Sequence, residues 1–335
     1  ETDTEVIAQL IAVMYKGDLE QAVREAVYLL KGTYGIAVVH KDEPGKIVGA
    51  RNGSPLVLGV GEGEMFLASD VMAMMAHTKS AIYLEDGELV SLTKDSYKMF
   101  DINDRHLEKE VEHIHWELEQ LEKNGYTTFM EKEIHEQSQS IQRALQGRLD
   151  MDGATGHLGG LNLTAKELLN IERVEIVAAG TSYYAGMVGA YLLERMARIP
   201  AHAELSSEVR YKNPIVQPST LYFVVSQSGE TADTLYAMRE LQRKGATVLG
   251  VCNVVGSTIP RESDGGVYIH SGPEIAVAST KAFTSQISVF YLFTLLMARM
   301  RHYSFEEGYS FINELNRIPA LVEQTLQRAA QVREV

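Results

Sequence analysis

Cysteine is nearly absent from this chain, since Cys252 is the only one among 335 residues. A single cysteine excludes a disulfide framework and suits a reducing compartment, so we expect a cytoplasmic protein. Because Cys252 follows the apolar run 247–251, we expect its thiol to be buried and to carry no chemistry. Long apolar runs are missing too. The longest, residues 288–298, is about half a membrane span, which predicts a core helix and no membrane partner.

Positive charge is also scarce. The chain has 31 Lys and Arg against 45 Asp and Glu, a net charge of −14, which makes nucleic acid an unfavourable partner. No G-K-[ST] follows a glycine-rich turn and no G-x-G-x-x-G follows an apolar run, so neither nucleotide-binding fingerprint is present. His113 and His115 alternate, but the sequence places no third ligand beside them, so we expect no metal and no cofactor.

The most informative stretch that is present is LYFVVSQSGETADT, residues 221–234. Its apolar start predicts a buried strand, which leads into a turn rich in hydroxyl groups and then into a helical pattern. The first turn of a helix has unpaired amides and partial positive charge, so it can hold an anion. Ser226, Ser228 and Thr231 add hydroxyl donors, and together they predict a phosphate site. The alternative is that a serine here only caps the helix.

The same arrangement of strand, hydroxyl-rich turn and helix occurs twice more. Residues 174–182 read VEIVAAGTS and place Thr181 and Ser182 before a predicted helix. Residues 272–284 read GPEIAVASTKAFT and place Ser279 at the start of a long apolar helix. Because the carboxyl ends of parallel strands share one edge of a sheet, the three loops are expected to surround one phosphorylated ligand.

Lys281 is the one cation close to these loops in sequence. Two interpretations stay open for it. It contacts the ligand, or it pairs with Glu274 or Asp233.

Apolar runs alternate with helical patterns from residue 174 onward, which predicts an α/β fold with a parallel sheet covered on both faces. We expect a doubly wound, five-stranded parallel sheet. The predicted strands are 174–178, 201–205, 221–225, 247–251 and 267–270, and the predicted helices are 183–197, 231–244 and 279–300.

The first hundred residues predict an α+β unit that ends near Asp101. Two amphipathic helices over 4–31 come first, and short strands follow. Residues 82–84 and 88–92 are predicted to form a hairpin through Asp86-Gly87. Residues 103–150 are charged and predicted to be mostly helical, as in a connector between domains.

Motifs along almost the whole chain resemble the glutamine–fructose-6-phosphate aminotransferases. GTSYYAG at 180–186, SSEVRY at 206–211, SQSGETADT at 226–234 and GPEIAVASTKAFT at 272–284 resemble the family's first sugar-isomerase (SIS) domain in order and spacing. ETDTEVI at the start, LLKGTYGIAVV at 29–39, NGSPLVLGVG at 52–61 and ASD at 68–70 resemble the latter half of its glutaminase domain. MEKEIHEQ at 130–137 is similar to its connector.

The resemblance implies three parts. Residues 1–102 would be the C-terminal part of a class II glutamine amidotransferase domain of the N-terminal-nucleophile type, 103–150 a helical connector, and 151–335 an SIS-type five-stranded sheet. Enzymes of this family hydrolyse glutamine in the first domain and use the ammonia to convert fructose-6-phosphate to glucosamine-6-phosphate. The resemblance implies these sugar phosphates and glutamine as small-molecule partners, and a homodimer as the assembly.

The resemblance places no catalytic residue in this chain, because the glutaminase cysteine and the isomerase Glu, His and Lys have no counterparts here. It therefore implies a part that binds the sugar phosphate and is inactive alone. A different class of function also remains open: a non-catalytic SIS-domain sensor or regulator that responds to a sugar phosphate.

The family's substrate contacts carry over onto ten positions of this sequence. Asp3 matches the carboxylate that pairs with the α-amino group of glutamine, although it could equally be a helix cap before Thr4. The positions that match the sugar-phosphate contacts are Gly180, Thr181, Ser182, Ser226, Gln227, Ser228, Thr231, Val277 and Ser279.

The chain departs from the family pattern at four positions. Ala179 stands where the family commonly has cysteine, and Thr128 where it commonly has histidine. Ser138 occupies the position after Glu136-Gln137 at which the family usually has proline, and Val209 occupies a position that is usually aromatic. The changes at Thr128 and Ser138 bear on the geometry between domains.

Overall fold

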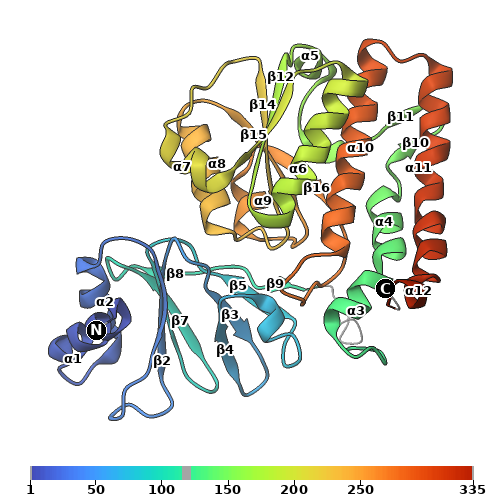
Figure 1. Ribbon diagram of the computed structural model, residues 1–335. Helices are drawn as coiled ribbons and strands as arrows, with labels where there is room; N and C mark the ends of the chain where they lie inside the picture. The colour runs from blue at the N-terminus through green and yellow to red at the C-terminus, as the bar shows by residue number, and fades with distance from the viewer. Residues whose placement is uncertain (1, 115–121, 334–335) are drawn as a thin grey trace. The chain divides into compact units, whose positions relative to one another are not determined.

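The computed structural model describes residues 2–114 and 122–333. It divides the chain into two compact units, Glu1–Leu118 and Glu119–Val335, here called unit 1 and unit 2. Figure 1 traces both units. His115, half of the alternating histidine pair, lies outside the described residues.

Unit 1 contains two antiparallel sheets and two packed helices. One sheet has the strand order β1-β2-β6-β7-β8 and the other β4-β3-β5-β9. Apolar side chains from both sheets, among them Leu58, Ile82, Val90 and Met99, form one buried cluster, so the sheets pack face to face. The elements are α1 (Asp3–Met14), α2 (Leu19–Leu29), β1 (Tyr34–Val38), β2 (Ile47–Asn52), β3 (Val57–Val60), β4 (Met65–Ala68), a 3-10 turn Val71–Ala73, β5 (Ser80–Tyr83), β6 (Glu88–Leu92), β7 (Tyr97–Asp101), β8 (His106–Leu107) and β9 (Glu112–His113).

The predicted hairpin through Asp86-Gly87 is wrong, because its two strands belong to different sheets. β5 pairs with β3, while β6 pairs with β2 and β7. The Asp86 carboxylate accepts from the Gly53 amide at 2.7 Å and lies 3.4 Å from Nε of the buried Arg51. These contacts over more than thirty residues hold the segment as a crossover between sheets.

The segment 103–150 is less helical than expected. Its first part contributes β8 and β9 to the two sheets of unit 1. Helices appear in unit 2, as α3 (Phe129–His135) and α4 (Gln137–Leu145), and they are followed by the short pair β10 (Leu149–Asp150) and β11 (Thr155–Gly156).

Unit 2 contains the expected five-stranded parallel sheet, with the order β13-β12-β14-β15-β16. Every neighbouring pair in it is parallel. β12 and β14 are adjacent although β13 lies between them in sequence, so the chain reverses direction across the sheet at this point. The strands are β12 (Arg173–Ala178), β13 (Ala201–Leu205), β14 (Thr220–Ser226), β15 (Thr247–Cys252) and β16 (Gly265–Tyr268).

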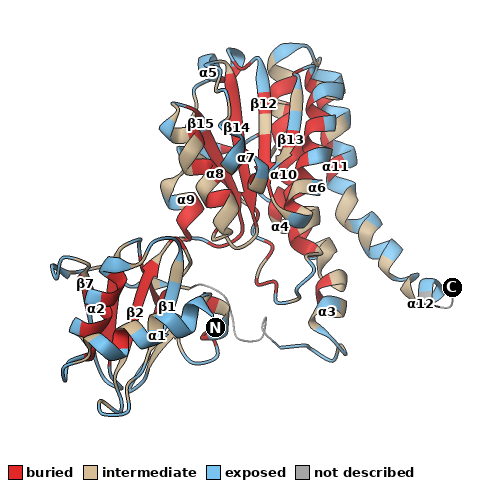
Figure 2. Cartoon of the chain, turned by 60° about the vertical axis from the view of Figure 1, so that its left-hand side comes forward, coloured by how far each residue is buried: buried red, intermediate tan, exposed pale blue. Residues whose placement is uncertain are grey.

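Alternate strand residues supply two cores, one on each face of this sheet. Ile176, Phe223 and Val251 belong to a cluster with residues of α4, α6, α10 and α11. Val177, Val224 and Val248 belong to a second cluster with residues of α7, α8 and α9. The inner strands β12, β14 and β15 are accordingly buried along most of their length (Figure 2), as near-continuous apolar runs require, whereas the edge strands β13 and β16 are only partly buried. The helices are α5 (Ala165–Leu169), α6 (Gly180–Leu192, continued by a π-turn to Ala197), α7 (Ser206–Lys212), α8 (Ala232–Arg243), α9 (Thr258–Glu262), α10 (Lys281–Arg301), α11 (Phe305–Leu326) and α12 (Ala329–Arg333), with a 3-10 turn at Gly159–Leu161.

Helix α10 is longer than the apolar run expected from the sequence. By length and composition its 21 residues could cross a membrane, and among the described residues it is the one helix that meets this test. Within the structure 72% of its apolar window is buried, and Phe290, Phe293 and Leu295 lie in the core of unit 2. This burial is typical of the central helix of a packed domain.

Candidate functional site

The turn between β14 and α8 brings three hydroxyl groups together at the end of a buried strand. Ser226 is the last residue of β14, and Thr231 is the N-cap of α8. Ser226 Oγ lies 2.9 Å from Thr231 Oγ1 and 3.5 Å from Ser228 Oγ. Ser226 is 2% exposed, whereas Ser228 and Thr231 are half-buried and accessible. This gives a compact polar cluster at the amino end of a twelve-residue helix.

Two amides of this turn already have acceptors inside the turn. The Gly229 amide donates to Ser226 Oγ at 3.0 Å, and the Glu230 amide donates to Ser228 Oγ at 3.2 Å. Ser226 therefore shapes the turn, but neither serine caps α8, because its N-cap is Thr231 and no side chain forms a cap bond there. The hydroxyl protons of Ser228 and Thr231 remain able to turn toward an anion.

Glu230 lies within this turn, yet its charge is directed away from the hydroxyl cluster. Its carboxylate accepts from the amide of Thr258 at 2.7 Å and from the Thr258 hydroxyl at 2.9 Å, at the start of α9. The carboxylate is therefore hydrogen-bonded to the start of α9 and not to the hydroxyl groups of the 226–231 turn.

Gly229 is required by the geometry of the turn. Its φ is +69°, and a Cβ built on it would lie 2.0 Å from Ser257 Oγ and 2.8 Å from Ser257 Cβ. Only glycine satisfies both the backbone conformation and the close approach of the chain that follows β15.

The second hydroxyl loop differs from its prediction in where the helix starts. α6 begins at Gly180, so Thr181 and Ser182 lie in its first turn and do not precede it. Gly180 has a φ of +57° and is exposed, and Thr181 is half-buried. β12 and β14 are paired in register, with Ala178 opposite Val225, so this helix start and the 226–231 turn lie at the same sheet edge.

Ser182 has a partner that the sequence did not reveal. Gln286, one turn and a half into α10 and 1% exposed, donates from Nε2 to Ser182 Oγ at 3.0 Å. Because Ser182 accepts this bond, its own proton is left to donate elsewhere. Gln286 thereby orients the Ser182 hydroxyl.

The third loop, residues 272–280, carries Val277 and Ser279. Val277 is fully exposed and Ser279 is half-buried, both ahead of α10. Both pairings expected for Lys281 are wrong. Its Nζ bonds Glu136 Oε2 at 2.5 Å, while the carboxylates of Glu274 and Asp233 accept from backbone amides and from Arg210, respectively. Lys281 is 2% exposed and faces α3, 145 residues earlier in the chain.

Asn253 joins the first and third loops, and sequence reasoning missed it. It follows β15 and is 3% exposed. Its backbone amide donates to the Gln227 carbonyl at 3.1 Å. Its side-chain Nδ2 donates to the Gly272 carbonyl at 2.7 Å, and its side-chain Oδ1 accepts from the Ser271 backbone amide at 2.9 Å. Asn253 thus fixes the position of the 226–231 turn relative to the start of the 272–280 loop.

Asp3 lies in unit 1, on the first turn of α1. The helix cap is Thr2, whose hydroxyl accepts from the Glu5 amide at 3.2 Å. The Asp3 carboxylate accepts from the adjacent Thr4 amide at 2.7 Å and is exposed. Asp3 is therefore not the N-cap, and its carboxylate is accessible to solvent.

The departures from the family pattern have local explanations. Thr128 caps α3 by accepting from the Glu131 amide, and Ser138 donates to the Pro319 carbonyl of α11. Val209 is buried in the core between α7 and α8. Ala179 is the N-cap of α6 and supplies no side-chain bond there.

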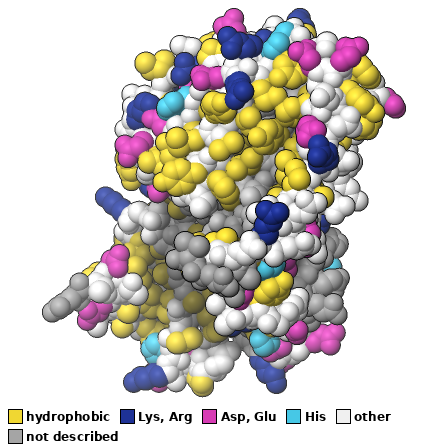
Figure 3. All heavy atoms as spheres, turned by 45° about the vertical axis from the view of Figure 1, so that its right-hand side comes forward, with side chains coloured by type: hydrophobic (Ala, Val, Ile, Leu, Met, Phe, Trp, Pro, Cys, Tyr) yellow, Lys and Arg dark blue, Asp and Glu magenta, His cyan; other side chains and the backbone are white. Residues whose placement is uncertain are grey.

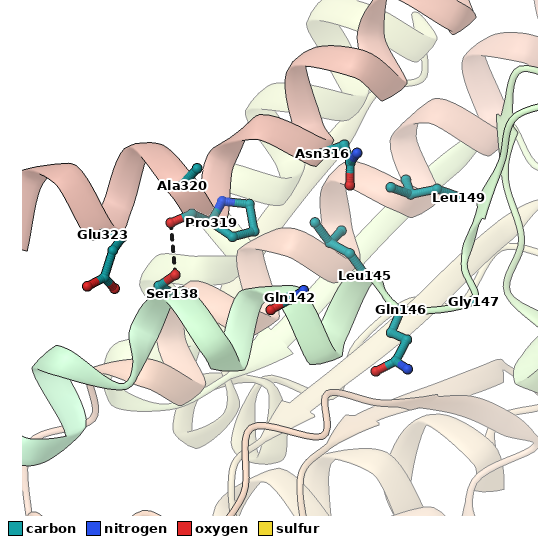
Figure 4. A pocket seen from close by; sticks show the side chains of 10 residues that line it. All are labelled: Ser138, Gln142, Leu145, Gln146, Gly147, Leu149, Asn316, Pro319, Ala320 and Glu323. Atoms are coloured by element: carbon teal, nitrogen blue, oxygen red, sulfur yellow. Dashed lines mark hydrogen bonds between the residues drawn. The ribbon is translucent and has the colours of Figure 1, made fainter.

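A cavity of about 640 Å3 lies apart from these loops, between α4 and α11 (Figure 4). Ser138, Gln142, Asn316, Pro319 and Glu323 are among its lining residues. None of the ten sequence-predicted site residues lines it. Its walls carry one acidic side chain and no basic one, so it offers no attraction for a phosphate.

Cys252 is buried at the end of β15, and burial raises the pKa of its thiol well above the ordinary value. A thiol held neutral in this way is a poor nucleophile. Within residues 2–114 and 122–333, no group of three or more His, Cys, Asp or Glu side chains is arranged to hold a metal ion.

Similarity to known proteins agrees with this architecture. Residues 167–296 match the family model of the SIS domain, and this range holds the parallel sheet, helices α6 to α9, most of α10 and the hydroxyl-rich loops. Unit 2 therefore contains a SIS domain.

The chain as a whole is homologous to the glutamine–fructose-6-phosphate aminotransferases (isomerizing). It is 45% identical to that of Chlorobaculum tepidum over 100% of this chain and 55% of the relative. It is 45% identical to that of Clostridium tetani over 98% of this chain and 54% of the relative. The chain thus spans about half the length of these relatives.

A solved structure also aligns with the chain. The C-terminal domain of glucosamine-fructose-6-phosphate aminotransferase from Francisella tularensis superposes with a TM-score of 0.60 at 35% identity. The alignment covers 64% of this chain and 60% of that one.

Proposed function

We propose that this chain is part of an aminotransferase that makes glucosamine-6-phosphate and glutamate from fructose-6-phosphate and glutamine, and that unit 2 holds the sugar phosphate. The observation that carries the proposal is the cluster of Ser226, Ser228 and Thr231 hydroxyls at the amino end of α8. Its hydroxyl donors and the helix dipole suit a phosphate dianion without an arginine. The names of the relatives add the reaction.

The sugar itself would lie between the three loops. Gly180, Thr181 and Ser182 would face it from α6, and the support for Ser182 is the bond that it accepts from Gln286. Gln227 flanks the phosphate, and Val277 and Ser279 close the site from the 272–280 loop. The support is the common sheet edge of β12 and β14 and the link through Asn253.

Unit 1, including its strands β8 and β9, would be the remainder of a glutaminase domain, so this domain extends past the expected end at residue 102. A connector to residue 150 would follow it. Asp3 would pair with the α-amino group of glutamine, which its exposed carboxylate permits. The family resemblance implies a cysteine nucleophile. A protein of these 335 residues has only the buried Cys252, so we expect no glutaminase turnover from it. A cytoplasmic location is part of the same proposal.

Isothermal titration of this chain with fructose-6-phosphate tests the proposal. We expect saturable binding of fructose-6-phosphate and of glucosamine-6-phosphate, and no measurable heat with fructose or glucosamine, because the phosphate supplies the charge-assisted bonds. A parallel assay for glutamate release is expected to give none. Equal binding of the sugars without phosphate, or sustained glutamate release, would contradict the proposal.

We also propose a homodimer. Tyr184, Met187 and Tyr191 of α6 are 59%, 48% and 56% exposed and lie on one helix face at spacings of three and four residues. Figure 3 shows hydrophobic side chains gathered over one side of unit 2. Exposed apolar stripes of this kind mark interaction surfaces, and a two-fold axis would bury the stripe against its copy.

Light scattering at micromolar concentration tests the pairing. We expect twice the chain mass of 37.2 kDa for the wild type. Replacing Tyr184, Met187 and Tyr191 by glutamate together is expected to give the monomer mass with an unchanged far-ultraviolet circular dichroism spectrum, and with a lower thermal midpoint because the stabilisation from association is lost. A monomeric wild type would disprove the homodimer.

A further inference from the structure

The 272–280 loop has no regular secondary structure, yet hydrogen bonds to side chains hold its backbone on both sides of the exposed tip. Its first residue, Gly272, has a φ of +76°, and its tip residue, Val277, is fully exposed. A loop without a ladder of backbone bonds needs other acceptors for its amides. Two buried glutamates supply them.

Glu133 of α3 binds the first half of the loop. It is 2% exposed, and its Oε1 accepts from the amides of Ile275 at 2.6 Å and Ala276 at 3.1 Å. Glu274 binds the second half, where its Oε1 accepts from the amides of Thr280 at 2.8 Å and Ala282 at 3.1 Å. The exposed residues Val277 and Ala278 lie between these two anchor points.

The burial of Glu133 is costly unless the amide bonds offset it. Burial raises the pKa of its carboxyl above the ordinary value, the nearby Glu274 raises it further, and the two amides act in the opposite direction. Its second oxygen, Oε2, is buried and makes no hydrogen bond within the described structure. The hydrogen bonds that stabilise the buried Glu133 carboxylate are therefore those from the loop amides.

Helix α3 is held against the same region by a second set of charges. Glu136 accepts from Lys281, the first residue of α10, and its other oxygen lies 3.6 Å from Lys132 Nζ. Lys132 also bonds the Glu122 carbonyl at 2.5 Å. α3 thus contacts both the loop and the helix that follows it, so a displacement of α3 would remove the acceptor of the Ile275 and Ala276 amides.

We propose that Glu133 is a positioning residue for the sugar-phosphate site. From α3 it fixes the loop that carries Val277 and Ser279, and it does not contact the ligand itself. The inference rests on the proposed function of that site. Because coupling between a ligand and a conformation is reciprocal, sugar-phosphate binding in turn stabilises the docked position of α3.

The test compares variants of Glu133 by titration with glucosamine-6-phosphate and by hydrogen exchange of the 272–282 segment. Glu133→Ala and Glu133→Asp are expected to weaken binding about tenfold and to speed amide exchange at Ile275 and Ala276 by a similar factor, because both withdraw the acceptor. Glu133→Gln keeps an acceptor oxygen in place and is expected to bind within about threefold of wild type.

The matched control is Glu131→Ala on the same helix, because the Glu131 carboxylate bonds the Thr127 amide at the start of α3. It is expected to leave binding and loop exchange unchanged. Wild-type affinity in Glu133→Ala, or weakened binding without faster exchange at the two amides, would overturn the inference. Absence of binding by the wild type itself would instead refute the proposed function, and exchange in the free protein would still report whether Glu133 holds the loop.

Discussion

Replacing Ser226 and Ser228 together by alanine is expected to weaken the binding of fructose-6-phosphate by about 100-fold or more. Each hydrogen bond to a charged group contributes roughly 1.5–3 kcal/mol, and about 1.4 kcal/mol corresponds to a factor of ten in affinity. Ser228 is accessible for direct contact, whereas Ser226 also holds the Gly229 amide and so preserves the shape of the turn. Titration calorimetry measures the loss.

Ser219→Ala is the matched control for this double variant. Ser219 lies just before the first residue of β14, at the end of the strand opposite Ser226, and its hydroxyl donates to Glu172. It is expected to bind as the wild type does. The single variants separate the two roles. Ser228→Ala should lower affinity with little effect on unfolding, and Ser226→Ala should lower both. Unchanged affinity in the double variant would contradict the assignment of the phosphate to this turn.

Gly229→Ala is expected to destabilise unit 2 by roughly 2–5 kcal/mol, since the backbone penalty for a left-handed conformation adds to the cost of overpacking. The new methyl group would meet the Ser257 side chain at a distance no carbon atom tolerates, so the chain after β15 must move. Denaturant unfolding followed by circular dichroism measures the change.

Gly245→Ala separates the two contributions. Gly245 follows α8 with a φ of +86°, but a Cβ there would meet no atom within 4 Å. It is expected to cost about 1 kcal/mol, the backbone term alone. If both variants lose the same stability, the close contact with Ser257 does not matter and the account of the turn is wrong.

The parallel sheet of unit 2 could be predicted because its evidence is local. Runs such as Leu221–Val225 are apolar without alternation, and the structure buries them on both faces. The crossover at Asp86-Gly87 could not be predicted in the same way. Its sequence is that of a tight hairpin, but contacts with Arg51 and Gly53 override the local preference.

In the candidate site, too, features with local sequence evidence could be predicted, whereas those that depend on distant residues could not. The hydroxyl groups of Ser226, Ser228 and Thr231 could be found because they stand within six residues of one another in a strand–turn–helix pattern. Gln286, Asn253 and Glu133 could not, because they act on loops 19 to 143 residues away and a single polar residue in a helix or after a strand has no distinctive pattern. The partner of Lys281 was missed for the same reason, since Glu136 is 145 residues away in the chain.

A crystal structure of this chain with glucosamine-6-phosphate is the most direct test of the central claim, which is that hydroxyl groups and a helix N-terminus suffice to hold the phosphate. We expect the phosphate oxygens within hydrogen-bond distance of Ser228 Oγ and Thr231 Oγ1, at the start of α8. A ligand in the cavity between α4 and α11, or a 226–231 turn left empty at saturating ligand, would contradict the claim.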